Sequence, residues 1–314
     1  MLHEFVLKLF NELDRKDANG FNISELFEQY KYSETEVIEI KENGYGTDFI
    51  KIKILGSNGK SKGGSAKTLG IIGRLGGVGA RPEQIGFVSD GDGALAALSA
   101  ALKIIDMKNK GDQLEGDVII ATHVDPKAPS IPHDPVPFMG SSVDMTIMNK
   151  HEIDSEMDAI ITIDTTKGNR IVNNKGICIS PTVKEGYILR VSEDLLDIME
   201  RVTGRPAFVL PITVQDITPY GNDIFHINSI LQPATSTDKP VVGLAIITES
   251  VVPGSGTGAS HLNDVEEAAR FSVEVAKAFG KEKAKFYDVD EYERIEKLYG
   301  SMKVLQTLGN IKEV

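Results

Sequence analysis

Residues 117–123 read DVIIATH, and residues 158–164 read DAIITID. Both are short apolar runs bounded by polar residues, a pattern typical of strands that are buried on both faces. Before the first run, residues 94–107 (ALAALSAALKIIDM) predict a strong helix, because they are rich in alanine and contain no Gly or Pro. Short buried strands that alternate with helices predict an α/β fold, with a mixed, largely parallel sheet covered by helices on both faces.

The rest of the chain continues this alternation. Further strands are expected at 36–40, 48–55, 187–191, 207–213 and 241–248. Further helices are expected at 3–14, 22–30, 193–202, 263–279 and 290–308. Ser192 and Gly204 frame the helix at 193–202 as its N-cap and its C-terminal stop. Asn263 to Glu266 resemble a capping box that opens the next helix.

The 314 residues contain no internal repeat, no low-complexity segment and no linker rich in Pro or Ser. We therefore expect a single α/β domain over residues 1–314, with a helical N-terminal lead at 1–33 and no inserted lid domain. The hydrophobic fraction of 41% and the charged fraction of 25% are ordinary for a soluble globular protein.

Cysteine content and the N-terminal sequence favour the cytoplasm. The single cysteine, Cys178, excludes an intrachain disulfide and lies in an apolar run, so we interpret it as a small buried hydrophobe. No signal peptide is recognisable, and no apolar run approaches the roughly 20 residues of a membrane span. A net charge of −12 argues against binding to nucleic acid, because that affinity depends on Lys and Arg.

Polar residues follow these strands or precede these helices at four places. Asp90 precedes the helix at 94–107, Asp125 and Asp164 lie where strands end, and His261 precedes the helix at 263. Function in such sheets gathers at the carboxyl ends of the strands, so we expect these residues at one edge. Carboxylates with an imidazole suit a divalent metal, with zinc favoured over cobalt or manganese. Without a cation, such a cluster of carboxylates would repel itself.

Each of these residues could also have a purely structural role. Asp90 could cap the helix, Asp164 could be a turn residue, and His261 could bond to backbone. His123 alternates with Val124 along a strand, so it shares a face with Asp125. It could be a second metal ligand, a base that accepts a proton from water, or one half of a His–Asp pair that fastens a loop.

Two runs carry a resemblance to a family. LGIIGRLGGVGARPEQIGFVSDGDGA (69–94) and VQDITPYGNDIFHINSILQPA (214–234) resemble the bacterial and archaeal family called domain of unknown function 1177, over nearly the whole chain. The order of motifs is also similar to the zinc aminopeptidases of the glutamyl and tetrahedral type. That resemblance implies a three-layer sandwich fold and self-association. The implied metal ligands are Asp90 as the bridging residue, Asp125, Asp164 and His261.

The same resemblance implies a substrate-binding turn at Gly221, Asn222 and Asp223. The chain departs from the aminopeptidase pattern at two positions, where Ser57 replaces an early His and Val124 replaces the catalytic Glu. The resemblance therefore supports the fold and one metal position better than it supports peptide hydrolysis.

A glycine-rich segment at 73–82 carries Arg74 and Arg81. Its glycine spacing fits neither a P-loop nor a dinucleotide fingerprint. It is either a flexible loop or a loop whose arginines bind an anionic part of a substrate.

Three functions stay open on the sequence. The first is a metal-dependent hydrolase of an amide or peptide bond, similar to an aminopeptidase. The second is a non-hydrolytic relative that binds metal and an amino-acid-like or peptide ligand. The third is an enzyme of another class on the same fold. In each case the expected partner is a small molecule or a peptide.

Overall fold

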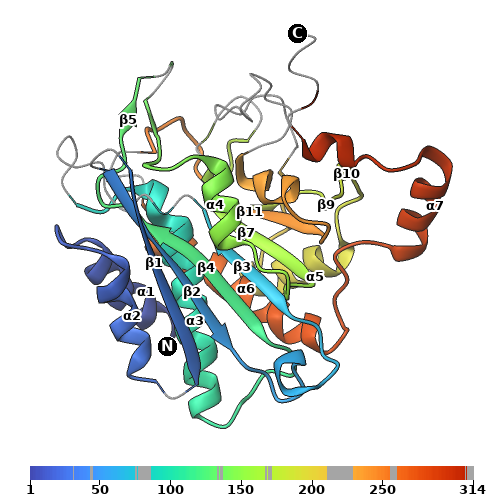
Figure 1. The fold of residues 1–314 in the computed structure, drawn as a ribbon, viewed down its shortest axis with the longest axis horizontal. Coiled ribbons are helices and arrows are strands. Elements are labelled where there is room, and N and C mark those ends of the chain that lie inside the picture. The colour runs from blue at the N-terminus through green and yellow to red at the C-terminus, as the bar shows by residue number, and fades with distance from the viewer. Residues whose placement is uncertain are drawn as a thin grey trace.

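The computed structural model describes residues 1–314 except 31, 43–44, 75, 77–85, 133, 135–136, 167, 169–171, 211–228, 255–259, 308 and 310–314. Its centre is a nine-stranded sheet in which the strand order is β1-β2-β4-β3-β7-β11-β9-β10, with β8 paired to β11 (Figure 1). The strands are β1 (Ser33–Glu42), β2 (Tyr45–Ile54), β3 (Leu69–Gly73), β4 (Val118–Val124), β7 (Ala159–Thr166), β8 (Gly176–Ile179), β9 (Val183–Lys184), β10 (Tyr187–Ile188) and β11 (Val241–Ile247). A separate hairpin pairs β5 (Ser130–Ile131) with β6 (Phe138–Met139).

The middle of the sheet is parallel. β4, β3, β7 and β11 run in the same direction, and antiparallel strands flank them on both sides. This arrangement confirms the mixed α/β sheet predicted from the short apolar runs. Both runs that predicted it, β4 and the first part of β7, are buried along their length.

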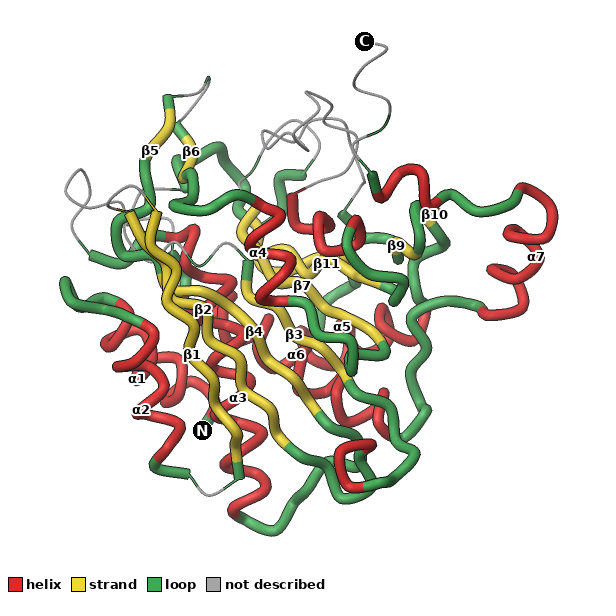
Figure 2. The backbone as a smooth tube through the Cα atoms, in the orientation of Figure 1, coloured by secondary structure: helices red, strands yellow, loops and turns green. Residues whose placement is uncertain are grey.

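Helices cover both faces of the sheet (Figure 2). The helices are α1 (Leu2–Leu13), α2 (Gly20–Glu28), α3 (Asp92–Asn109), α4 (Met145–Glu152), α5 (Glu193–Thr203), α6 (Leu262–Gly280) and α7 (Val289–Tyr299). Short 3-10 helices are η1 (Lys60–Lys62), η2 (Ser89–Gly91), η3 (Ser229–Thr235) and η5 (Lys303–Gln306). Within the described residues, none of these helices is both long and apolar enough to cross a membrane.

Alternation along the central strands builds two cores. Ile71 and Ile161 belong to the larger core, which contains residues of α1, α2, α3, α5 and α6. Their neighbours Ile72 and Ile160 belong to a second core with Ile230 of η3. Side chains of successive strand residues point to opposite faces, so each central strand contributes to both cores.

Several boundaries differ from the sequence-based expectations. The helix expected at 263 begins at Leu262 with His261 as N-cap and no side-chain cap, so the capping box is wrong. The last helix ends at Tyr299, and Gly300 separates it from η5. The strand expected at 187–191 is only two residues long. In the described part of 207–213, only Val209 pairs, through a bridge to Ile179.

Close packing between β3 and α3 depends on a glycine. A Cβ at Gly93 would overlap the carbonyl oxygens of Arg74 and Ile163, both of which are backbone atoms. The start of α3 can therefore lie directly against the ends of β3 and β7, which places η2 beside the carboxyl edge of the sheet.

Gly93→Ala should destabilise the protein by about 1–3 kcal/mol, because the methyl group overpacks against fixed backbone. At an ordinary helix position the same change would stabilise by roughly 0.5–1 kcal/mol. Urea denaturation measures whether the free energy of unfolding falls or rises in Gly93→Ala, and a fall indicates that the helix packs closely against the strands. An unchanged or raised free energy of unfolding would show that the helix does not approach the strands this closely.

Candidate functional site

The carboxyl ends of three central strands are level with one another. In the pairing register Ile72 of β3 lies opposite Ala121 of β4 and opposite Thr162 of β7. Continuing this register puts Arg74 beside His123 on one side and Asp164 on the other. The backbone N–H of Arg74 donates to the carbonyl of Ile163 at 2.7 Å, which fixes that level.

Asp90 and Asp164 come from different elements that are joined at this edge. Asp90 lies in η2, and Asp164 lies near the end of β7. The hydroxyl of Thr165 donates to the carbonyl of Ser89 at 2.7 Å. Because each of these residues is next in sequence to one of the two aspartates, the bond holds the two backbones together.

The start of α6 reaches the same place. The hydroxyl of Ser260 donates to the Asp92 carboxylate, which lies at the start of α3. His261 follows Ser260 and is exposed. The strand-end Asp164, the η2 residue Asp90 and the helix-start His261 therefore belong to segments that hydrogen bonds join.

Gly254 lies against the Asp90 carboxylate. Its carbonyl accepts from the Asp90 backbone N–H at 3.0 Å and from the Ser89 hydroxyl at 2.9 Å. A Cβ on Gly254 would overlap the Asp90 carboxylate oxygens. The absence of a side chain at this position thus lets the Asp90 carboxylate pack directly against the backbone of Gly254.

Asp125 is fully buried and holds backbone in place. Its two oxygens accept from the backbone N–H of Lys127 at 3.2 Å and of Ser142 at 3.0 Å. Burial raises the pKa of the nearby Asp48, and the charge of Asp125 acts in the same direction. Asp125 therefore fastens the segment that follows β4, and it adds negative charge to the edge.

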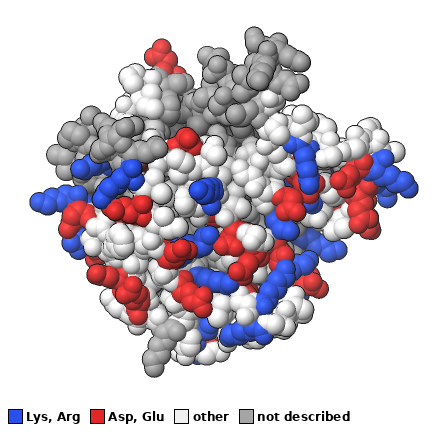
Figure 3. Space-filling model, in the orientation of Figure 1, with Lys and Arg blue, Asp and Glu red and all other residues white. Residues whose placement is uncertain are grey.

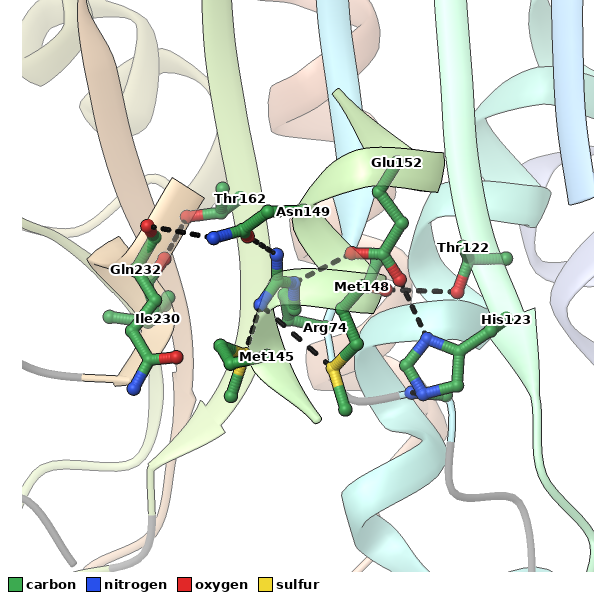
Figure 4. A network of polar contacts seen from close by, with 12 residues as sticks. Arg74, Thr122, His123, Met145, Met148, Asn149, Glu152, Thr162, Ile230 and Gln232 are labelled. Carbon is green, nitrogen blue, oxygen red and sulfur yellow. Dashed lines mark hydrogen bonds and ion pairs between the residues drawn. The ribbon is translucent and has the colours of Figure 1, made fainter. Parts of the chain in front are cut away.

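A fully buried polar network lies beside these carboxylates (Figure 4). Arg74 Nε donates to Glu152 Oε2 at 2.7 Å, and its Nη2 donates to Asn149 Oδ1. His123 Nδ1 lies 2.6 Å from Glu152 Oε1. Glu152, at the end of α4, thus joins β3 to β4.

The contacts of His123 fix its tautomer. Its Nε2 accepts the backbone N–H of Gly76 at 3.0 Å, so that nitrogen carries no proton. The proton is on Nδ1 and is donated to Glu152. His123 therefore pairs with Glu152 and not with Asp125, so the alternative in which a His123–Asp125 pair fastens a loop is wrong.

Charge balance lowers the pKa of Glu152. Burial alone would raise it, but the charge of Arg74 and the hydrogen bonds from His123 and Arg74 outweigh burial, so the pKa lies below its ordinary value of 4.5. Glu152 was not a candidate in the sequence, because nothing in residues 145–152 marks it as a partner of residues so far away.

The other candidates divide into two groups. The Arg74 guanidinium is buried in the ion pair with Glu152 rather than presented to an anion. Arg81, Gly221, Asn222 and Asp223 lie outside the described residues. Their roles in substrate binding stay predictions.

The donor chemistry at the edge fits a divalent cation. Asp90, Asp164 and His261 supply carboxylate and imidazole groups of the type that zinc, cobalt and manganese accept. Among the described residues, no group of three or more His, Cys, Asp or Glu side chains is already arranged to hold a metal ion. The joined backbones therefore bring the donors into one region, and the side chains would have to turn toward a bound cation.

Other features lie apart from this edge. Cys178 is buried, and burial raises the pKa of its thiol to about 12, so its interpretation as a buried hydrophobe is confirmed. An open cavity of about 390 Å³ between the starts of α5 and α7 is lined by none of the predicted site residues.

On the face seen in Figure 3, acidic and basic side chains are interspersed, and no basic patch stands out.

Solved structures with a similar chain trace include metal enzymes. Porphyromonas gingivalis glutaminyl cyclase is 12% identical, with a TM-score of 0.48 over 87% of this chain and 95% of that one. The Bacillus subtilis YXEP protein, a dinuclear metal-binding peptidase, is 8% identical, with a TM-score of 0.48 over 88% and 99%. A metallo-carboxypeptidase from Burkholderia cenocepacia is 9% identical, with a TM-score of 0.43 over 81% and 66%.

Sequence comparison identifies a family. The family model described as protein of unknown function (DUF1177) matches residues 38–309. No curated protein matches the chain in sequence. The chain therefore belongs to the DUF1177 family, as the two runs at 69–94 and 214–234 led us to expect.

Glu152→Gln should destabilise the protein by about 3–5 kcal/mol at neutral pH, because it leaves the Arg74 charge buried without a counter-charge. The control Glu156→Gln, which removes an exposed ion pair with Lys53, should cost less than about 1 kcal/mol. Urea denaturation of both variants measures the difference. Equal losses would show that the network carries no special stability.

The same variant changes the response to acid. Because the folded-state pKa of Glu152 lies below its unfolded value of 4.5, its stabilising contribution is present above pH 4.5 and is lost as pH falls through the folded-state pKa. Glu152→Gln should therefore lose less stability than the wild type on acidification below pH 4.5.

Proposed function

We propose that this member of the DUF1177 family is a metal-dependent hydrolase of an amide or peptide bond. Its divalent cation, most simply zinc, would be held by Asp90, Asp164 and His261, with Asp125 as a further candidate. The observation that carries the proposal is the pair of hydrogen bonds that join these segments, from Thr165 to Ser89 and from Ser260 to Asp92.

A divalent cation bound there would polarise a substrate carbonyl and lower the pKa of a bound water. The chain itself would supply orientation and proton transfer. The substrate would be a peptide or an amino-acid-like molecule, contacted through Gly221, Asn222, Asp223 and Arg81. By analogy with aminopeptidases, we also propose that the protein self-associates.

His123 is the proposed proton acceptor. Its Nε2 is unprotonated, and the Glu152 carboxylate on Nδ1 would stabilise the imidazolium that forms when Nε2 takes a proton. This pairing of a carboxylate with an imidazole also orients the ring. To act, Nε2 must exchange its bond with the Gly76 N–H for one with the reacting water.

One observation favours a second function, binding without turnover. Val124 occupies the position where aminopeptidases have their catalytic Glu, and it is fully buried in the larger core. It cannot act as a base or turn toward the edge. If His123 does not replace that Glu, the site would bind metal and an amino-acid-like or peptide ligand without cleaving it.

Asp90→Asn and Asp164→Asn should each weaken zinc binding by about 100-fold or more, since loss of even an outer partner costs about 10–100-fold. Gly254→Ala should weaken it by about 10–100-fold, because the methyl group crowds the Asp90 carboxylate without removing a ligand. Equilibrium dialysis followed by elemental analysis measures each affinity. Asp106→Asn, at the far end of α3, is the matched control and should bind zinc as the wild type does. Unchanged zinc binding in Asp90→Asn would refute the assignment.

His123→Gln keeps a hydrogen-bond donor for Glu152 but removes the imidazole. We expect it to retain metal and to lose about 10²–10⁴-fold in the turnover of amino-acid amides or short peptides with zinc, cobalt or manganese. His3→Ala, which removes an imidazole paired with Glu266 on the helical side, should leave turnover unchanged. Loss of metal in His123→Gln would make His123 a ligand instead. Absence of turnover in the metal-loaded wild type would favour the binding function.

A further inference from the structure

η3 is held over the ends of β7 and α4 by its backbone. The hydroxyl of Thr162 donates to the carbonyl of Ile230. Asn149 Nδ2 donates to the hydroxyl of Ser236 at 2.9 Å and lies 3.5 Å from the carbonyl of Gln232. Asn149 also accepts a hydrogen bond from Arg74, so it connects the backbone of Gln232 to the buried network.

The side chain of Gln232 is an exception in this well-bonded region. It is 1% exposed, and neither its amide oxygen nor its amide nitrogen has a hydrogen-bond partner in the described part of the chain. Two other glutamines do have partners: Gln113 donates to the carbonyl of Leu55 at 3.1 Å, and Gln306 donates to two carbonyls. A buried amide without partners is destabilising, so its retention calls for a group that pairs with it.

The direction of this side chain relates it to the candidate site. In Figure 4 the Gln232 amide extends away from Asn149, toward the side of the network on which Met145 and the His123 imidazole lie. On that side Arg74 Nη1 faces the thioether sulfurs of Met145 and Met148, which are weak acceptors. Because the Gln232 amide is itself buried from water, a hydrogen bond made to it would be stronger than one made in solvent.

We propose that Gln232 recognises a primary amide group of the substrate by pairing with it through both its oxygen and its nitrogen. This inference rests on the proposed function, because it names the chemical group of the substrate that the site would recognise.

The chemistry of the side chain selects this partner. The Gln232 amide presents an acceptor and a donor side by side, and a primary amide of a ligand offers the complementary donor and acceptor on one edge. In a trans peptide group the N–H and C=O point in opposite directions and cannot both reach one glutamine amide. A carboxylate would pair only with the nitrogen and leave the oxygen unsatisfied, whereas a cation would pair only with the oxygen. The charge of Arg74 is already balanced by Glu152, so no uncompensated cation nearby favours an anionic ligand.

A pair of small probes tests the inference independently of turnover. Benzamide carries one primary amide group, and methyl benzoate is its counterpart without an N–H. Ligand-observed NMR with the full chain and no added metal measures the binding of each probe. The wild type should bind the amide about 10-fold more tightly than the ester, because the ester leaves the Gln232 oxygen unpaired.

Gln232→Met keeps the shape of the side chain and removes both polar groups. It should abolish the preference for the amide and leave the melting temperature unchanged or raised, since no bond is lost on substitution. Gln113→Met is the matched control. It should lower the melting temperature, because it loses the bond to Leu55, and it should keep the preference for the amide.

Three results would overturn the inference. A melting temperature that Gln232→Met lowers as much as Gln113→Met does would show that the amide already has a partner, such as an ordered water. An amide preference retained in Gln232→Met would place the probe elsewhere. No saturable binding of the amide by the wild type would leave Gln232 without the proposed ligand. Failure of the proposed hydrolysis is distinguishable from failure of this inference. The first would be seen as a lack of turnover with the preference for the amide probe intact.

Discussion

Arg74 and Glu152 form an ion pair from which water is excluded on all sides, and this constraint organises the carboxyl edge of the sheet. Removing two charges from water is costly, and either charge alone would be far more so. The pair is tolerable because Asn149 and His123 supply further hydrogen bonds to it. Its members come from α4, β4 and the residue that follows β3, so breaking the pair would release α4 from the sheet and His123 from its orientation.

The edge contains two chemically different halves. On one side of β3, charges are balanced inside the Arg74–Glu152–His123 network. On the other side, Asp90 and Asp164 gather negative charge, and their neighbours hold the backbones together. In the function we propose, a cation held by these carboxylates and the neutral imidazole of the network would act on one substrate. Gln232, near the first half, would give that substrate a neutral anchor.

Local patterns predicted the elements that depend on local interactions. α5 begins after Ser192 and ends at Gly204, whose φ of 66° suits a glycine, because a cap and a stop are encoded within a few residues. The buried runs of β4 and β7 were equally evident. β3 was missed because LGIIG contains two glycines among five residues and shows no alternation.

The sequence could point to candidate residues only at the ends of strands and the starts of helices. A helix start pointed to Asp90 and strand ends pointed to Asp125 and Asp164, but these positions could not reveal that Asp125 binds backbone N–H groups. Glu152 escaped detection because its partners are 78 and 29 residues away in sequence. Nor could the sequence show that the buried amide of Gln232 lacks partners, since that property depends on how η3 packs over β7 and α4. Such contacts exist only once the sheet has assembled.

Anomalous diffraction from a zinc-soaked crystal, recorded at the zinc absorption edge, tests the central claim most directly. The account expects one strong peak with carboxylate oxygens of Asp90 and Asp164 and an imidazole nitrogen of His261 at about 2.0–2.2 Å. A peak bound by other residues, or the absence of any peak between these side chains at saturating zinc, would contradict it.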